Sequence, residues 1–163
     1  MITVLCPTYN EITYIEKLLE RLLEMEPADK ELIFIDGNST DGTLEFLAKA
    51  EQQYDEIKLL INPERYVSFA LNKGIKLAKG DIIIRIDAHC DYAYDYFTKI
   101  LQTFDDVDAE IVGGPTRTAA KEKFQEAVGF AISSSLGVGN SRVHDEKFRG
   151  YLDSVTFGAW RKI

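Results

Sequence analysis

Short apolar runs alternate with longer amphipathic segments along most of this chain. Between successive runs, apolar residues recur three or four positions apart, which predicts one helix in each interval. The runs begin about 25 residues apart, the order of spacing that two parallel strands joined by a helix require. We therefore predict an α/β fold with a mostly parallel sheet and helices on both faces. The apolar runs that predict strands are residues 2–6, 31–36, 57–61, 81–87 and 109–114.

The alternation changes after residue 114. An amphipathic segment from Phe124 to Leu136 predicts a fifth helix, a polar stretch follows it, and residues 154–160 are typical of another strand. The chain then stops at "RKI" without a closing helix. We expect one domain over residues 1–163 that is truncated at its C-terminus.

The composition is that of an acidic globular chain, with 45% apolar residues, 28% charged residues and a net charge of −8. Such a charge argues against the phosphate backbone of nucleic acid as a partner. No segment reaches the roughly 18 apolar residues of a membrane span, and the N-terminus has no basic stretch typical of a signal peptide. Cys6 and Cys90 make no disulfide framework, which favours a cytoplasmic location.

Polar residues gather where three of the predicted strands end. The first strand is followed by Pro7–Glu11, the second by Asp36–Gly42 and the fourth by Asp87–His89. Ligands bind beyond the carboxyl ends of parallel strands, so these clusters are candidates for one site. A simpler alternative stays open, in which they are ordinary loops and Ser39 or Asp41 caps the following helix. No cluster is a glycine-rich phosphate loop, which disfavours a dehydrogenase or a P-loop NTPase.

Asp87 and His89 follow the predicted buried run "IIIRI", residues 82–86. A carboxylate and an imidazole two positions apart could hold a divalent metal, or they could be solvated residues that open a loop. The neighbouring Cys90 suggests zinc, but no second pair of Cys or His residues accompanies it, and His144 stands alone.

Three segments in this order, "VLCPTYNE", "IFIDGNSTDGT" and "ALNKGIKLAKGDIIIRIDAH", resemble the donor-binding half of family 2 glycosyltransferases. The chain is most similar to the bacterial exopolysaccharide (succinoglycan-type) group, and the resemblance covers essentially its whole length. It implies the GT-A fold, a Rossmann-like three-layer sandwich. It also implies metal-dependent transfer of a sugar, with inversion, from a nucleotide-diphosphate donor such as a UDP-sugar to an acceptor hydroxyl.

The resemblance assigns parts of the donor site to individual residues. The first motif, from Pro7 to Glu11, lies against the nucleoside in the family, and Asp36 matches the aspartate that binds the base or ribose. We expect the Asp36 side chain to face the ligand and Arg65 to reach the diphosphate. The full set of implied donor-binding residues is Pro7, Thr8, Tyr9, Glu11, Asp36, Asn38, Ser39, Arg65, Asn72 and Asp87.

Asp87 and His89 occupy the position of the family's D-x-D motif, with His89 in place of the last aspartate. A D-x-H form that still binds metal occurs in other GT-A enzymes. The resemblance therefore implies that Asp87 and His89 bind Mn²⁺ or Mg²⁺. The imidazole favours Mn²⁺, because Mg²⁺ prefers oxygen ligands throughout.

The resemblance also sets expectations for the whole protein. Residues 1–114 would bind the nucleotide-sugar and residues 115–163 would begin the acceptor-binding part. The catalytic base is expected beyond Ile163, which would leave the isolated fragment inactive. The acceptor would be a glycan or a lipid-linked sugar, and missing C-terminal segments could bring the protein to the inner face of the membrane. We also expect self-association through an exposed strand edge.

Two other classes of protein stay open. One is a nucleotidyltransferase, which shares a related α/β layout but would carry a glycine-rich basic loop after the first strand. The other is a non-catalytic module that binds a nucleotide-sugar.

Overall fold

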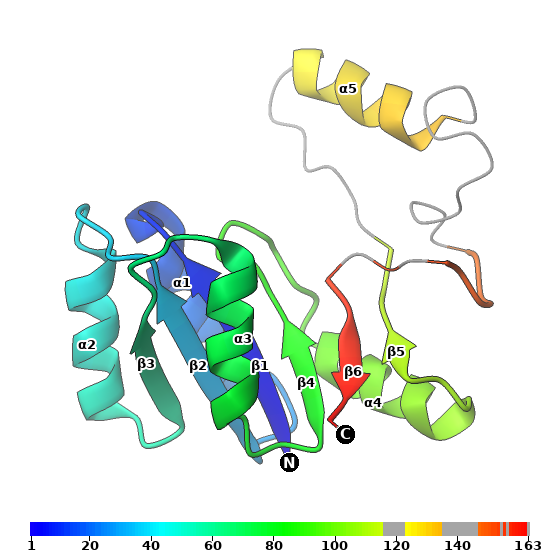
Figure 1. Cartoon of the computed structure of the whole chain (residues 1–163). Coiled ribbons are helices and arrows are strands. Elements are labelled where there is room, and N and C mark those ends of the chain that lie inside the picture. Colours follow the sequence, from blue (N-terminus) through cyan, green and yellow to red (C-terminus); the bar gives the residue numbers. More distant parts are fainter. Residues whose placement is uncertain (116–122, 135–146, 154, 156, 163) are drawn as a thin grey trace.

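A computed structural model describes residues 1–115, 123–134, 147–153, 155 and 157–162 of this chain. Its centre is a six-stranded sheet of order β3-β2-β1-β4-β6-β5 (Figure 1). The first four strands in this order are parallel, whereas β6 is antiparallel to both of its neighbours. The predicted α/β fold with a mostly parallel sheet is confirmed. The strands are β1 (Ile2–Thr8), β2 (Lys30–Asp36), β3 (Ile57–Ile61), β4 (Ile82–Arg85), β5 (Ile111–Val112) and β6 (Ala159–Arg161).

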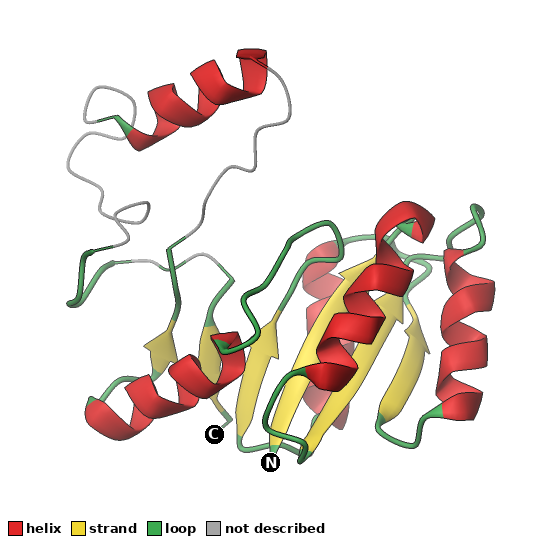
Figure 2. Ribbon diagram, turned by 180° about the vertical axis from the view of Figure 1, so that it is seen from behind, coloured by secondary structure: helices red, strands yellow, loops and turns green. Residues whose placement is uncertain are grey.

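Helices cover both faces of the sheet, as the sequence predicts. Side chains of α1, α2 and α4 pack into one apolar core, and those of α3 pack into a second core on the opposite face (Figures 1 and 2). The fifth helix lies apart from the sheet (Figure 1). No helix in the described part of the chain is long and apolar enough to cross a membrane. The helices are α1 (Ile12–Glu24), α2 (Thr43–Gln53), α3 (Val67–Leu77), α4 (Tyr96–Asp106) and α5 (Lys123–Ser133).

The two cores arise from the alternation of side chains along each strand. On β1, Val4 and Cys6 point toward α1, α2 and α4, whereas Leu5 points toward α3. On β2, Phe34 and Ile35 divide between the two faces in the same way. Because neither face of these strands meets water, consecutive positions are apolar, and this explains why the strands appear in the sequence as unbroken apolar runs.

The last strand returns from late in the chain to a place between β4 and β5. Trp160 lies opposite both Ile83 and Ile111. The observed strands are shorter than the sequence predicts there, since β4 ends at Arg85 and β6 begins at Ala159. The division into a nucleotide-sugar-binding part and an acceptor-binding part at residue 114 stays a prediction. The sheet contains strands from both sides of this residue. Leu136, at the predicted end of the fifth helix, lies outside the described residues.

Helix α3 comes unusually close to the sheet at Gly74. A Cβ atom at this position would lie 2.8 Å from Cδ2 of Leu5 and 3.3 Å from Cδ1 of Ile35. Both of those side chains are almost completely buried, so they have little room to move aside. The glycine therefore lets α3 lie directly on β1 and β2.

We expect Gly74→Val to lower the free energy of unfolding by about 1–3 kcal/mol, because the new side chain would overpack the core against Leu5. Urea unfolding measures the change. The matched control is Lys76→Val, which introduces the same side chain at an exposed position of the same helix and should cost about 0.5 kcal/mol. Equal effects of the two substitutions would contradict the close packing at Gly74.

Candidate active site

A cleft opens at the edge of the sheet where the parallel strands end. It encloses about 550 Å³, including the part that is open to solvent, which is within the usual range for small-molecule sites. In the sheet, β2 and β3 lie on one side of β1, and β4 lies on its other side. The cleft extends across this change of direction in the strand order. Such a reversal is the usual ligand position in open parallel sheets. Its polar and aromatic lining comprises Thr8, Tyr9, Glu11, Asn62, Arg65, Tyr66, Arg85, Asp87 and His89.

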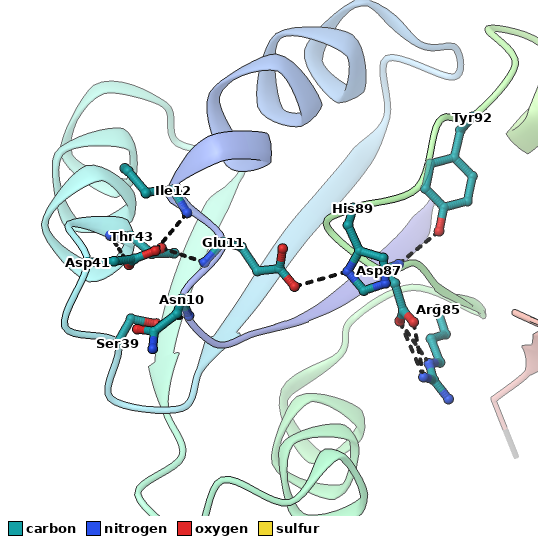
Figure 3. A network of polar contacts seen from close by, with 10 residues as sticks. All are labelled: Asn10, Glu11, Ile12, Ser39, Asp41, Thr43, Arg85, Asp87, His89 and Tyr92. Atoms are coloured by element: carbon teal, nitrogen blue, oxygen red, sulfur yellow. Dashed lines mark hydrogen bonds and ion pairs between the residues drawn. The ribbon is translucent and has the colours of Figure 1, made fainter. Parts of the chain in front are cut away.

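The loop after β1 is fixed to the loop after β2 by hydrogen bonds (Figure 3). Backbone N–H groups before and within the first turn of α1 would otherwise lack partners, as at any helix start. Side-chain oxygens of the second loop accept them instead. The three bonds run from Asn10 N–H to Ser39 Oγ (2.9 Å), from Glu11 N–H to Thr43 Oγ1 (2.9 Å) and from Ile12 N–H to Asp41 Oδ2 (3.0 Å).

Asp41 is the centre of this arrangement. Its carboxylate accepts hydrogen bonds from the backbone N–H and the hydroxyl of Thr43, at 3.0 and 2.6 Å, as well as from Ile12. Loss of hydration opposes the charged form, but these hydrogen bonds outweigh it and lower the pKa of Asp41 below its ordinary value. The simpler interpretation named Ser39 or Asp41 as the N-cap of the following helix, but that position is Gly42. Asp41, one residue earlier, nevertheless accepts the first N–H of α2 and the first N–H of α1, the helix of the neighbouring loop.

Asp36 is placed differently from our expectation. Its side chain is 0% exposed, and its oxygens accept hydrogen bonds from Thr8 Oγ1 (3.1 Å), from Ser39 N–H (2.7 Å) and from Ser39 Oγ (2.7 Å). Thr8 and Asp36 are direct neighbours in the register of β1 and β2, which explains the first bond. The expectation that the carboxylate faces the ligand is wrong for this structure. A contact between Asp36 and a nucleoside stays a prediction.

Tyr9 and Arg65 form one wall of the cleft. The guanidinium of Arg65 lies over the Tyr9 ring, 4.9 Å from its centroid, and its Nε donates to the carbonyl of Gly37 at 3.2 Å. The backbone of Arg65 is left-handed, with φ of 62°, a conformation that is strained for a long side chain. The predicted reach of Arg65 to a diphosphate stays a prediction, and in this structure its side chain supports Tyr9.

Glu11 and His89 meet at the other end of the cleft, where Oε1 of Glu11 lies 3.0 Å from Nδ1 of His89 (Figure 3). A carboxylate only accepts hydrogen bonds, so Nδ1 carries the hydrogen, and the neutral tautomer with this arrangement has its lone pair on Nε2. The Glu11 side chain is 18% exposed and that of His89 is 56% exposed. Glu11 thus lies beside the predicted metal ligand rather than beside Tyr9.

Asp87 is held from two sides. Its carboxylate pairs with Arg85, with Oδ1 3.3 Å from both Nε and Nη2, and its backbone N–H donates to Oη of Tyr92 at 2.8 Å. Burial raises the pKa of Tyr92, so the phenol stays neutral. Arg85 in turn lies 5.7 Å from the centroid of the Phe157 ring, which brings a late part of the chain to this end of the cleft.

The donor chemistry of this end fits a divalent metal ion in part. Asp87 and His89 supply one carboxylate and one imidazole, a mixed set that suits Mn²⁺ better than Mg²⁺. Within the described ranges, no three His, Cys, Asp or Glu side chains are grouped so that they could share an ion. An ion here would therefore need ligand oxygens or water to complete its coordination. Burial raises the pKa values of Cys6 and Cys90, which disfavours thiolate ligation of zinc; His144 lies outside the described residues.

Three other predicted site residues do not line the cleft. Asn38 is exposed beside Gly37, Ser39 belongs to the loop network, and Asn72 is exposed on α3. Asn72 is two positions from Ala70, which faces the sheet, and so points about 200° away around the helix. Lys73, its neighbour, pairs with Glu64 at 2.8 Å. Direct contacts of Asn38, Ser39 or Asn72 with a ligand stay predictions.

Three residues that line the cleft, Asn62, Tyr66 and Arg85, were not predicted from the sequence. Asn62 follows β3 directly, so the rule that ligands bind at the ends of parallel strands could have indicated it, as it did for the other three strands. Arg85 is a charged residue at the end of a buried strand, and this too is a detectable signal. Tyr66, which also lines the cleft, carries no comparable signal, because aromatic residues in loops are as often packing residues.

A mostly parallel sheet with a cleft at its carboxyl edge is common to open α/β folds, and comparison with solved structures assigns this one to the GT-A class. The mannosyltransferase PcManGT from Pyrobaculum calidifontis, solved in complex with GDP-Man and Mn²⁺, superposes with a TM-score of 0.66 at 29% identity, over 72% of this chain and 36% of that one. Residues 1–349 of TarS from S. aureus in complex with UDP give a TM-score of 0.62 at 19% identity, over 74% of this chain and 37% of that one. At 19% identity, the similarity to TarS shows a shared fold and nothing further.

Sequence comparison identifies the family. The profile described as "Glycosyl transferase family 2" matches residues 3–156, and the chain belongs to that family. It is 34% identical over 142 residues to the succinoglycan biosynthesis protein ExoA of Rhizobium meliloti, covering 85% of this chain and 43% of that protein. It is 30% identical over 149 residues to a dolichyl N-acetyl-alpha-D-glucosaminyl phosphate diacetamido-dideoxy-glucuronosyltransferase of Methanococcus voltae, covering 86% and 46%. The chain thus spans less than half the length of these relatives.

The Asp41 carboxylate gives a prediction about pH. Because its pKa in the folded protein is lowered, its contribution to stability is present above the ordinary value of 3.8 and is lost as the pH falls through the lowered value. We expect Asp41→Asn to be less stable than the parent at pH 7, with a difference that shrinks below pH 3.8. Urea unfolding across this range measures it. The control is Asp55→Asn, an exposed aspartate away from the loops, and a pH-independent difference for Asp41→Asn would refute its role.

Proposed function

We propose that this chain binds a nucleotide-diphosphate sugar, with UDP-sugars as the first candidates, together with a divalent metal ion. In this proposal it is the donor-binding part of an inverting glycosyltransferase of family 2. The observation that carries the proposal is one cleft with two unlike ends. Tyr9, backed by Arg65, lies at one end, and Asp87, His89 and Glu11 lie at the other.

The end at Tyr9 suits a nucleobase. The Tyr9 side chain is 44% exposed, so part of its ring is free to stack on a flat ligand, while Arg65 and the carbonyl of Gly37 hold the assembly in place. Stacking on an aromatic ring is a common way to hold a base.

The end at Asp87 suits a diphosphate held through a metal. When bound, the ion would neutralise the leaving diphosphate and act as a Lewis acid. The chain's own residues prepare the ligands: Arg85 and the Tyr92 hydroxyl orient Asp87, and Glu11 fixes the hydrogen of His89 on Nδ1. Such outer partners orient ligating histidines in many metal sites. The bound Mn²⁺ of PcManGT, a neighbour at 29% identity, supports the same chemistry here.

Sugar transfer is proposed for the whole protein, because the chain spans less than half the length of the relatives that it matches. The acceptor would be a hydroxyl of a glycan or of a lipid-linked sugar, as the names of those relatives suggest. Its deprotonation requires a general base, which we do not assign among the residues of the cleft.

We expect UDP to bind more tightly with Mn²⁺ than with EDTA in isothermal titration. Asp87→Asn should weaken the Mn²⁺-dependent part by about 1–3 kcal/mol, because it removes a charged ligand. Glu11→Gln should reduce Mn²⁺ affinity by about tenfold, the effect of losing an outer partner. The control is Asp105→Asn, an exposed aspartate on α4. Binding of UDP and Mn²⁺ by Asp87→Asn that equals the parent's would show that the metal site lies elsewhere.

Arg65 offers a test that separates binding from stability. Arg65→Gly relieves a left-handed backbone while it removes the support of Tyr9, so stability should stay within about 1 kcal/mol of the parent. UDP affinity should fall several-fold. Arg65→Lys, which keeps the charge and the backbone strain but lacks the planar group, should lose affinity and gain no stability. Unchanged UDP affinity in Arg65→Gly would exclude Tyr9 and Arg65 as the base-binding wall.

A further inference from the structure

Residues 86–95 join β4 to α4 without a helix or strand of their own. Asp87 and His89 belong to this loop, so the position of the loop decides where the two proposed metal ligands lie. A segment that lacks the regular hydrogen bonds of a helix or strand needs other contacts to hold it in one conformation. The contacts between this loop and the rest of the chain therefore bear directly on the site.

The loop runs alongside one face of α1. Tyr14, Lys17 and Arg21 are three or four positions apart along the helix, so they share this face. The Tyr14 ring lies edge-on to that of His89, with the ring centroids 6.4 Å apart, and Nζ of Lys17 lies 3.4 Å from Oδ1 of Asp91. Successive positions of the helix thus meet successive parts of the loop.

Arg21 is the residue of this face that binds the backbone of the loop. Its Nη1 donates to the carbonyl of Tyr92 at 2.5 Å, its Nη2 lies 3.8 Å from Oδ1 of Asp91, and its guanidinium lies 4.7 Å from the centroid of the Tyr94 ring. The Arg21 side chain is 24% exposed, whereas those of Lys17 and Asp91 are both 70% exposed. Exposed ion pairs contribute little to stability, so the hydrogen bond from Arg21 to Tyr92 is the contact that holds the loop.

Tyr92 connects this contact to the metal end of the cleft. Its hydroxyl accepts a hydrogen bond from the backbone N–H of Asp87 at 2.8 Å (Figure 3). Its ring is buried in the core, where its centroid lies 5.3 Å from that of Tyr96. Arg21 therefore fixes the backbone of Tyr92, and the hydroxyl of Tyr92 fixes the backbone of Asp87. A displacement of Tyr92 would displace the proposed ligand as well.

We propose that Arg21 is a positioning residue for the metal site. It holds the loop against α1 through the carbonyl of Tyr92 and so keeps Asp87 and His89 in place before an ion binds. Ligands that are already ordered lose less conformational freedom when the ion binds, which strengthens binding. The role of Arg21 rests on the proposed function, because it requires a divalent ion at Asp87 and His89.

The first test measures Mn²⁺ affinity in the presence of UDP, from the EPR signal of the free ion. Arg21→Met keeps an unbranched apolar stem and lacks every donor, so it should weaken Mn²⁺ binding by about tenfold, the lower end of the range for outer partners of a metal site. Its UDP affinity in EDTA should equal the parent's, because Tyr9 and Arg65 are untouched. Arg21→Lys, which keeps the charge without the planar fork, should lie between the two. The matched control is Lys17→Met on the same face of α1, which should stay within about twofold of the parent because its pair with Asp91 is exposed.

The second test asks whether Arg21 acts through Tyr92. Tyr92→Phe removes the hydroxyl that accepts from Asp87 and keeps the ring in the core, and it should also weaken Mn²⁺ binding several-fold. Two residues that act along one route are not additive, so the double variant Arg21→Met with Tyr92→Phe should bind Mn²⁺ about as well as the weaker single variant. A general loss of stability would not produce this coupling. Thermal unfolding checks that each variant is folded.

The outcomes separate the two proposals. Mn²⁺ affinity in Arg21→Met that equals the parent's would overturn the role of Arg21 and leave the metal site intact. The same holds if Arg21→Met weakens UDP equally with Mn²⁺ and with EDTA, since the residue would then support the whole cleft, or if its effect and that of Tyr92→Phe simply multiply. If Arg21→Met does not fold, Arg21→Lys decides in its place. UDP binding by the parent that is the same with Mn²⁺ and with EDTA would overturn the proposed metal site and the role of Arg21 together.

Discussion

The cleft depends on the hydrogen bonds that join the loop after β1 to the loop after β2. The N-terminus of α1 exposes backbone N–H groups that no residue of its own loop satisfies, and Ser39, Asp41 and Thr43 accept them. These bonds set the position of Glu11, and through Glu11 they set the hydrogen of His89. A loop that looks like an ordinary helix start is therefore the support on which the opposite end of the site is built.

Charge is distributed unevenly along the cleft. Arg65 and the Tyr9 ring lie toward β3, while Asp87 and Glu11 lie toward β4 and are only partly offset by Arg85. An elongated ligand with a flat uncharged part and an anionic part can use both ends only if a cation accompanies it. In the proposed complex, the metal would therefore govern the orientation of the nucleotide as well as the chemistry.

Much of this could be predicted from the sequence, since unbroken apolar runs and helical periodicity depend on burial, which is repeated along each element. The edge that carries the site followed from the direction of parallel strands. The roles of single side chains did not follow, because they depend on contacts between distant segments. Asp36 accepts a hydrogen bond from Thr8 because the two residues lie opposite each other in the register, and the contact of Glu11 with His89 joins residues 78 positions apart.

The position of β6 between β4 and β5 has a consequence for how the chain is made. Residues 159–161 fill the middle of a sheet whose other members are all translated earlier, so on the ribosome β4 has an unpaired edge until they emerge. Parallel pairing of β1 with β2 and β4 can be complete by then, but Arg85 acquires the neighbouring Phe157 only at this late stage. The end of the cleft at Tyr9 can thus form during synthesis before Arg85, at the other end, has all its neighbours, and an interruption of translation between residues 115 and 157 would leave an open strand edge available for aggregation.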